Sequence, residues 1–341
     1  MKIGLIGCGG MGTTHNLSLK ELSKRKDVQV VALADCRPEK LAQAAELWPE
    51  AHLYEFGEAL LQQETLDAVD ICLPSYLHVE HALMALEKGI HVFVEKPVCL
   101  TAADCQRLLD AQQASGCKVM VGQVLRSAAE YRFLKDAFDE GRYGSLHSIV
   151  MQRISGDVIW GFEDWFHNES KSGSVVLDLH LHDLDFLRWM LGEPDSFSCQ
   201  AAALNSGMVN QIFVSYRFGR VLAVTEGCWD RSPALPFEAS YRAAFDEATV
   251  VWNSRAAQPL TVYYTNGRVE YPELHTEYEG ESSAANINIS KLGPYYAELD
   301  YFVDCVMKDL PIQRAQLSEA VASVCQAIQE LADAKASLVV Q

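Results

Sequence analysis

The residues best suited to chemistry begin near the amino end, where glycines follow a short apolar run. They form the turn Gly7-Cys8-Gly9-Gly10-Met11-Gly12, which fits the spacing G-x-G-x-x-G. In such a turn the first glycine permits a tight bend, the second lets backbone approach a pyrophosphate, and the third lets the next helix pack closely on the strand. The phosphate then binds the free N–H groups of that helix's first turn. The spacing predicts a dinucleotide site, with a purely structural glycine turn as the alternative.

An acidic residue in the next apolar run indicates which dinucleotide binds. Asp35 follows Gln29–Ala34 and lies 23 residues after Gly12. A carboxylate at this position accepts hydrogen bonds from both ribose hydroxyls and repels a 2′-phosphate, so NAD is favoured over NADP. Arg37 could face such a phosphate, or it could be a solvated residue at the start of the next helix.

A lysine and a histidine could handle the proton of an alcohol oxidation. Lys96 follows a fifth apolar run, and the carboxyl ends of parallel strands are where doubly wound sheets bind ligands. Its ammonium could hydrogen-bond the reacting oxygen, and His182 is a natural proton acceptor near neutral pH. On a helix Asp178, His182 and Asp185 share one face, so Asp178 could orient the imidazole or bind a substrate hydroxyl. In isolation, Asp178 would instead be a helix cap and His182 a core histidine.

Several further residues are weaker candidates. His180 and His182 diverge on a helix and no third ligand has a suitable spacing, so no metal site is expected. His180 is interpreted either as a residue that supports the catalytic side chains from behind or as packing. Gln123 and Arg126 follow the sixth apolar run and could contact nicotinamide or substrate, or lie on the surface. The aromatic and imidazole side chains before the His182 helix could line a sugar site, although its tryptophans could equally be core; these residues are Trp160, Trp165 and His167.

The elements that must position these residues follow from hydrophobic periodicity. Up to about Gly122, short apolar runs alternate with amphipathic segments, which predicts a doubly wound parallel sheet, a Rossmann domain over residues 1–122. The expected strands are Lys2–Ile6, Gln29–Ala34, Ala68–Leu73, His91–Val94 and Lys118–Val121. The expected helices are Met11–Ser23, Pro38–Leu47, Leu77–Lys88 and Ala102–Ser115.

The pattern changes in residues 123–341, where consecutive alternating runs predict an α+β domain with an open, mostly antiparallel sheet. Its expected strands are Ser148–Ser155, Gln211–Phe218, Val221–Trp229, Ser240–Phe245 and Leu260–Tyr264. Its expected helices are Ala128–Glu140, Val175–Leu191, Pro294–Met307 and Ser318–Ser337, of which the last two could pack back on the first domain. Residues Glu279–Asn288 are expected to form a mobile loop.

Composition excludes several classes of function. The chain has 28 basic and 46 acidic residues, a net charge of −18, and such a surface repels phosphate backbones and anionic lipid. No targeting leader or stretch of eighteen apolar residues is evident. None of the ten cysteines forms a C-x-x-C pair, so we expect a reduced, cytoplasmic protein without nucleic-acid or membrane partners.

Two further motifs give the chain a family resemblance. They are Glu95-Lys96-Pro97 and the segment Asp178-Leu179-His180-Leu181-His182-Asp183-Leu184-Asp185. With the glycine turn, these motifs resemble the Gfo/Idh/MocA family, the glucose–fructose oxidoreductase and inositol dehydrogenase group. Smaller similarities are Pro74-Ser75-Tyr76-Leu77-His78, Gly141-x-x-Gly144 and Tyr295-x-x-Glu298.

The resemblance implies roles for particular residues. Lys96 falls on the family's catalytic lysine, and Asp178 and His182 fall on its D-x-x-x-H pair. Cofactor contacts are implied for the segments after the fourth and fifth strands, namely Pro74, Ser75, His78, Glu95 and Lys96. The resemblance also implies a homodimer or homotetramer formed through the open sheet of the second domain. Two departures, His180 in place of glycine and Ser172-Gly173-Ser174 in place of three glycines, could alter the substrate pocket.

The sequence therefore predicts an NAD-dependent oxidoreductase that acts on a CH–OH group of a sugar, inositol or related polyol. Two alternatives remain open at this point. One is a glycosidase that retains NAD and oxidises its substrate transiently, and the other is a non-catalytic NAD-binding regulator. The sequence does not decide the substrate, the direction of reaction, or whether the bond before Pro97 is cis.

Overall fold

A computed structural model describes residues 1–203, 207–276, 278–281 and 292–338, so positions 282–288 of the expected loop lie outside the described residues. The chain divides into two compact units. The first comprises residues 1–127 and 276–322, and the second comprises residues 128–275 and 323–341. Within the described ranges, no helix is both long and apolar enough to cross a membrane.

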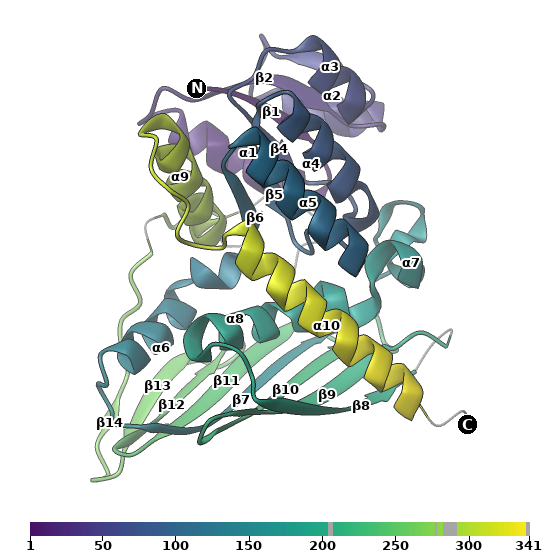
Figure 1. Cartoon of the computed structure of the whole chain (residues 1–341). Helices are drawn as coiled ribbons and strands as arrows, with labels where there is room; N and C mark the ends of the chain where they lie inside the picture. The colour runs from purple at the N-terminus through teal and green to yellow at the C-terminus, as the bar shows by residue number, and fades with distance from the viewer. Residues whose placement is uncertain (204–206, 277, 282–291, 339–341) are drawn as a thin grey trace. The chain divides into compact units, whose positions relative to one another are not determined.

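The first unit is built on a six-stranded sheet in which every pairing is parallel (Figure 1). Its order is β3-β2-β1-β4-β5-β6, so the strand order reverses between β1 and β4. The core strands are continuous apolar runs because helices cover both faces of the sheet. The bounds are β1 Lys2–Ile6, β2 Gln29–Ala34, β3 His52–Tyr54, β4 Ala68–Ile71, β5 His91–Glu95 and β6 Val119–Gly122.

Helices connect these strands and cover the sheet. Helices α1 and α9 pack against one another, and α4 packs against both α3 and α5. Thr101 caps α5 by accepting the Asp104 N–H, and Gly116 ends this helix in the left-handed conformation. The bounds are α1 Gly10–Leu22, α2 Pro38–Ala45, α3 Gly57–Gln63, α4 His78–Glu87, α5 Ala102–Ser115 and α9 Gly293–Met307. Helix α10, Leu317–Ser337, begins in this unit and continues into the second.

The second unit contains an eight-stranded sheet of order β14-β13-β12-β11-β7-β10-β9-β8. The β7–β10 pair is parallel and the other pairs are antiparallel. The strand bounds are β7 Leu146–Ser155, β8 Ser196–Ala202, β9 Gln211–Phe218, β10 Val221–Trp229, β11 Glu238–Phe245, β12 Ala248–Asn253, β13 Leu260–Tyr264 and β14 Val269–Glu270. The helices are α6 Ala129–Asp139, α7 Glu169–Ser172 and α8 Leu181–Leu191, and a π-helical turn over Val176–His180 precedes α8.

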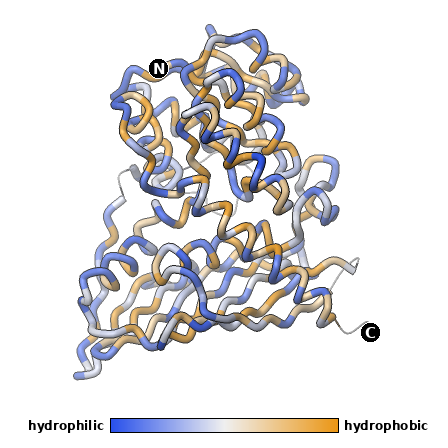
Figure 2. The backbone as a smooth tube through the Cα atoms, viewed as in Figure 1, coloured by the Kyte–Doolittle hydropathy of each residue, from blue (hydrophilic) through white to orange (hydrophobic). Residues whose placement is uncertain are grey.

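One face of this sheet is buried and the other is open. Along β9 the side chains alternate, with Ile212, Val214 and Tyr216 buried and Phe213 exposed. Apolar and polar residues therefore alternate along these strands, whereas the strands of the six-stranded sheet are apolar in runs (Figure 2). This difference is expected for a sheet with helices on only one face.

The predicted fold class is confirmed, and the structure differs from the expected elements at several places. Strands β8, β12 and β14 and the short helix α7 were not among the expected elements. Strand β3 and helix α3 were not predicted, because an exposed three-residue edge strand and a seven-residue helix carry little periodicity. The single helix expected over Val175–Leu191 is wrong at its start, where residues 176–180 form the π-helical turn. A π-turn holds more residues than an α-turn, so side-chain directions derived from the 3.6-residue repeat do not apply there.

Candidate cofactor and active site

Most of the candidate residues in the first unit lie at one edge of the parallel sheet. The glycine turn follows β1, Asp35 follows β2, Ser75 follows β4, Lys96 follows β5 and Gln123 follows β6. Carboxyl ends of parallel strands all meet at the same edge, and the reversal of strand order opens a crevice there in doubly wound sheets. The topology therefore gathers these five strand ends at the ligand-binding edge of the fold.

The glycine turn is shaped by close backbone contacts. A Cβ atom on Gly12 would lie 1.8 Å from the Gly7 carbonyl oxygen, and a Cβ on Gly7 would lie 2.6 Å from the Cys72 carbonyl oxygen. Gly7 also has a φ of 90°, which favours glycine. Gly9 occupies the N-cap of α1 and no side chain caps that helix end. The turn thus leaves N–H groups of α1 for an anion, as a pyrophosphate requires.

Asp35 holds the turn against β2 and is paired with Arg37. Its Oδ2 accepts the Cys8 N–H at 2.8 Å. The Arg37 guanidinium donates from Nε to Oδ1 at 2.9 Å and from its terminal nitrogen to Oδ2 at 2.8 Å. Burial opposes ionisation of Asp35, but the hydrogen bonds from Arg37 and Cys8 lower its pKa. The partly exposed Arg37 side chain is thus a bidentate partner of the carboxylate that is the candidate for binding the ribose.

His78 links the segments that follow β4 and β5. Its Nδ1 lies 2.8 Å from the Pro97 carbonyl oxygen and its Nε2 lies 2.7 Å from the Leu73 carbonyl oxygen. Burial lowers the pKa of His78, so the neutral ring has one N–H to donate to one of these two carbonyls. Ser75 is buried at the start of a short 3-10 turn and Pro74 precedes it. His78 is therefore enclosed between the segments that follow β4 and β5.

The neighbouring side chains of Lys96 and Glu95 lie in different surroundings, one partly exposed and the other buried. The Lys96–Pro97 peptide bond is cis. Lys96 is partly exposed, whereas Glu95 is 6% exposed and its Oε2 accepts the Lys96 backbone N–H at 3.1 Å. Gly122 makes room for this inward carboxylate, since a Cβ there would lie 2.8 Å from Glu95 Oε1. Glu95, predicted as a cofactor contact, thus directs its side chain into the unit rather than to the sheet edge.

Gln123 and Arg126 follow β6 in a short 3-10 turn, Val124–Arg126. Both side chains are buried, so the surface alternative for them is wrong. Arg126 donates to Glu319 at the start of α10, within the same unit. The Gln123 Nε2 is buried and has no hydrogen-bond partner in the described structure. A buried amide with an unused donor is available to a ligand.

Asp178 and His182 are distinguished by their exposure within the second unit. Both are partly exposed, whereas every other residue from 172 to 187 is buried. Asp185, which was expected on the same face, is instead buried and accepts the Ser323 Oγ hydrogen bond at 3.0 Å. The π-helical turn changes the rotation between Asp178 and the residues of α8. Asp185 lies within α8 with His182, and its contact with Ser323 on α10 accounts for its burial.

His180 is buried within the second unit. It is fully buried, its Nε2 lies 2.7 Å from Glu330 Oε2, and the Tyr216 hydroxyl lies 3.1 Å from the same nitrogen. A Cβ on Gly227 would lie 2.8 Å from the His180 Cβ, so this glycine makes room for the imidazole. The departure from the family's glycine is thus accommodated inside the unit.

The aromatic segment before α7 is packed on itself. Trp165 stacks on Phe166 with ring centroids 3.9 Å apart, and Trp160 contacts Phe166 edge-on. His167 is held by Asp164 and by Asp157, whose Oδ1 lies 2.8 Å from Nε2. Burial opposes the charged form of His167, but these two carboxylates raise its pKa. The segment thus presents a half-buried tryptophan and an anchored imidazole.

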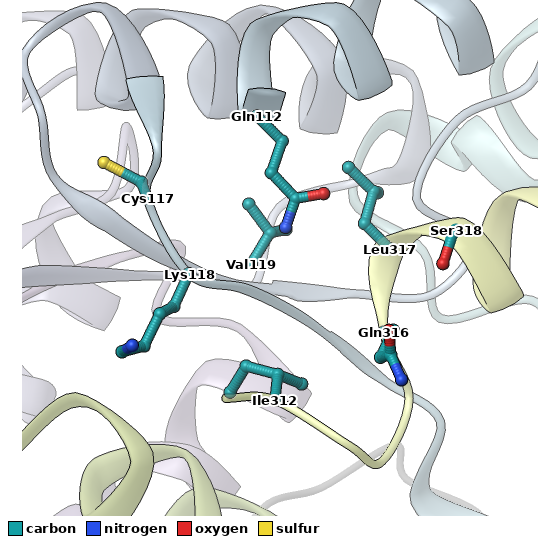
Figure 3. Close-up of a pocket in the computed structure, with 8 residues that line it drawn as sticks. All are labelled: Gln112, Cys117, Lys118, Val119, Ile312, Gln316, Leu317 and Ser318. Carbon is teal, nitrogen blue, oxygen red and sulfur yellow. The ribbon is translucent and has the colours of Figure 1, made fainter. Parts of the chain in front are cut away.

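A small hollow of about 160 Å³ opens elsewhere in the first unit (Figure 3). It is lined by residues from the end of α5, the start of β6 and the start of α10, including Gln112, Lys118 and Gln316. Lys118 precedes β6, so the hollow lies at the amino edge of the sheet, opposite the glycine turn. Its lysine is already paired with Asp309 at 2.8 Å. The hollow therefore lies away from the strand ends that carry the candidate residues.

A buried group of polar residues that the sequence pattern did not predict lies behind Lys96. His15 on α1 contacts Asp70 on β4 and Glu95 on β5, and Glu298 on α9 lies beside them. A histidine three residues after the last glycine of the turn was the available signal for this group. Its position on the inner side of α1 depends on tertiary packing.

Comparison with family models identifies both parts of the chain. Residues 1–123 match the model described as an oxidoreductase family with an NAD-binding Rossmann fold. Residues 131–270 match the model of the GFO/IDH/MocA C-terminal domain. The two matches follow one another in the order expected for one family.

Curated relatives give partial matches. A myo-inositol 2-dehydrogenase of Thermotoga maritima is 30% identical over 193 residues, 57% of this chain and 55% of the relative. A D-glucoside 3-dehydrogenase of Escherichia coli is 26% identical over 194 residues, with the same coverage. The chain thus matches about half the length of these relatives.

Solved structures match over nearly the whole chain at low identity. A levoglucosan dehydrogenase in complex with NADH and levoglucosan has a TM-score of 0.84 and 19% identity, covering 99% of this chain and 98% of that one. A scyllo-inositol dehydrogenase of Lactobacillus casei with bound NAD(H) and scyllo-inositol has a TM-score of 0.78 and 20% identity, covering 98% and 96%. At these identities the likeness establishes the fold.

Proposed function

Because the chain belongs to the Gfo/Idh/MocA oxidoreductase family and carries its NAD-binding Rossmann fold, we propose that it transfers a hydride between NAD and a carbinol carbon of a sugar, inositol or related polyol. The observation that carries this proposal is the row of strand ends described above. A phosphate turn, a ribose-binding carboxylate and a lysine share one sheet edge. The relatives' names, inositol and glucoside dehydrogenases, support the substrate class.

The residues present fit an NAD molecule. The space beside Gly9 is limited only by the Arg37 guanidinium, so backbone can approach a pyrophosphate there. Asp35 offers two carboxylate oxygens where a ribose diol would lie, and the unpaired Gln123 amide lies at the end of β6. When bound, NAD supplies the hydride acceptor for alcohol oxidation.

The chain's own residues handle the proton in this proposal. Lys96 hydrogen-bonds the reacting hydroxyl oxygen, and its positive charge stabilises the developing alkoxide. His182 accepts the hydroxyl proton as general base, and Asp178 orients the imidazole or binds a neighbouring hydroxyl. The partial exposure of Asp178 and His182 within a buried segment supports these roles, because a substrate must reach them.

The open face of the eight-stranded sheet supports assembly with a second copy of this chain. Val150, Val224 and Ser215 are cross-strand neighbours on this face, flanked by the exposed Phe213 and Leu222. Apart from Ser215 these side chains are apolar, and exposed apolar side chains gathered on one face are typical of protein interfaces. We propose a homodimer or homotetramer formed through this face.

The test is a panel of inositols, sugars and glycosides incubated with NAD while NADH and released aglycone are both measured. Net NADH formation from one or more polyols is expected. Glycoside cleavage without net NADH would replace the proposal with the redox-assisted glycosidase. If the protein binds NAD but turns over no compound of the panel, the non-catalytic NAD-binding regulator becomes the remaining hypothesis.

A further inference from the structure

Buried ionisable residues form a connected group directly behind Lys96. His15 is fully buried, and its Nδ1 lies 3.0 Å from Asp70 Oδ2. Its Nε2 lies 3.2 Å from Glu95 Oε1. The other oxygen of Glu95 accepts the Lys96 backbone N–H at 3.1 Å. The imidazole therefore bridges the ends of β4 and β5, and the bridge ends on the backbone of the lysine.

Glu298 completes this group from α9. It is 1% exposed, and neither of its carboxylate oxygens has a hydrogen-bond partner in the described structure. One of its oxygens, a ring nitrogen of His15 and a Glu95 oxygen all lie within 4.8 Å of one another. An ionised carboxylate that is buried without a hydrogen-bond partner would strongly destabilise the fold. The negative charge of Glu298 must therefore be neutralised.

The balance of charges among His15, Asp70, Glu95 and Glu298 indicates how Glu298 is neutralised. If Asp70, Glu95 and Glu298 were all ionised, three buried negative charges would face the single positive charge of His15. Two carboxyl groups that share one site do not both ionise, because one retains its proton. A proton on Glu298 removes one charge and supplies the donor that the Glu95 oxygen lacks.

We propose that His15 and Glu298 are positioning residues for Lys96, and that Glu298 acts as an un-ionised carboxylic acid whose O–H donates to the Glu95 carboxylate. His15, as the imidazolium, donates from Nδ1 to Asp70 and lies as the counter-ion of Glu95. Together they fix the Glu95 carboxylate, which in turn holds the Lys96 backbone. The role of Lys96 rests on the proposed function, whereas the protonated state of Glu298 does not.

The directions in which the pKa values of these buried groups shift agree with this arrangement. Burial raises the pKa of Glu298, and the neighbouring Glu95 raises it further, with His15 opposing and Asp70 adding to the rise. Burial opposes the charge of His15, but Asp70 and Cys72 outweigh it and raise the pKa of His15 well above its ordinary value. Burial likewise opposes ionisation of Glu95, yet His15 and Lys96 lower the pKa of Glu95.

Infrared difference spectroscopy on the full chain tests the carboxylic acid directly. At neutral pH the wild-type protein should show a C=O stretch of a protonated carboxyl group that is absent from Glu298→Gln. The absence of this band from the wild type would overturn the proposal. A stoichiometric divalent cation in the purified protein, released by chelator and lost in Glu298→Gln, would also overturn it, because the three ligand atoms would then hold a metal.

Kinetics with two substitutions at one position test the positioning role. Glu298→Gln keeps an N–H donor for Glu95, so its kcat should stay within about threefold of wild type. Glu298→Ala removes the donor, so kcat should fall about tenfold or more while the Kd for NAD stays nearly unchanged. Equal losses in the Gln and Ala variants would overturn the donor assignment.

Asn16→Ala is the matched control for a loss of stability. Asn16 neighbours His15 in α1, is 2% exposed, and bonds away from β5 to the Ala44 carbonyl and Trp48. The Asn16→Ala substitution should lower the melting temperature. At a temperature where the variant remains folded, its kcat should equal that of the wild type. If Asn16→Ala and Glu298→Ala lose kcat equally, the effect is merely structural and the positioning role is wrong.

A measurement that does not require catalytic turnover tests the positioning of Lys96 independently of the proposed hydride transfer. The rate at which an amine reagent acylates Lys96, followed by mass spectrometry, should change in Glu298→Ala but not in Asn16→Ala. Such a change without any polyol oxidation would contradict the proposed function and leave the positioning intact. Unchanged Lys96 labelling in Glu298→Ala would contradict the positioning.

Discussion

Gly12→Ala should disrupt the phosphate turn itself. An alanine Cβ at this position would lie 1.8 Å from the Gly7 carbonyl oxygen, and ordinary contact begins at 3.4 Å, so a displacement of 3.4 − 1.8 = 1.6 Å is needed. The opposing atom is backbone and no side chain can rotate away. Overpacking of this kind costs about 1–3 kcal/mol, and the better helix propensity of alanine returns at most about 1 kcal/mol. The net effect is a loss of stability.

The measurement is thermal unfolding together with NAD titration by calorimetry. For a protein of this size each kcal/mol corresponds to a shift of about 2–4 °C in Tm, so Gly12→Ala should melt several degrees early. Its NAD affinity should fall about tenfold or more, because moving α1 moves the N–H groups that hold the pyrophosphate.

Gly9→Ala is the matched control in the same turn. Its Cβ would meet only the end of the Arg37 side chain, at 3.2 Å, and its φ is −70°. It should therefore keep the wild-type Tm while losing NAD affinity. A Gly12→Ala protein with wild-type Tm and wild-type NAD affinity would refute the reasoning, because α1 could then move from β1 at no cost.

Lys96→Ala and His182→Ala should each lower kcat by about 10²- to 10⁴-fold while NAD still binds, and near wild-type turnover would exclude either role. Asp35→Ala should weaken NAD binding and, by releasing its arginine partner, narrow the preference over NADP; an unchanged cofactor ratio would mean that Asp35 does not contact the ribose. Val224→Glu should shift sedimentation towards a monomer, whereas an unchanged sedimentation coefficient would exclude the open sheet face as the interface. The raised pKa of His15 means that its stabilising charge is complete below about pH 6.5 and is lost as the pH rises towards the folded-state pKa, so Tm should fall over that window in wild type and less in His15→Gln.

The strands of the Rossmann sheet could be predicted because local runs of apolar residues mark them in the sequence. In the run Lys2–Ile6 every residue after Lys2 is buried and none is polar, and the run leads straight into a glycine turn. Strand β3 could not be predicted in the same way, because its three residues are exposed or only partly buried and no periodicity marks them.

Other features depend on contacts that no local pattern encodes. The π-helical turn over Val176–His180 changes the rotation between Asp178 and α8, and Asp185 within α8 is buried against Ser323 of α10. The pairing of Arg37 with Asp35 and the inward direction of Glu95 depend on which groups lie across the sheet edge. Spacing thus identified candidate residues, whereas the directions of their side chains required the fold.

The most direct test of the proposed hydride transfer uses a polyol that the panel identifies as a substrate, deuterated at its carbinol carbons. After incubation with NAD, mass spectrometry of the reduced cofactor should find one deuterium transferred from the substrate, and Lys96→Ala should transfer it far more slowly. Reduced cofactor without deuterium, or no reduced cofactor from any polyol while NAD remains bound, would contradict hydride transfer at this site.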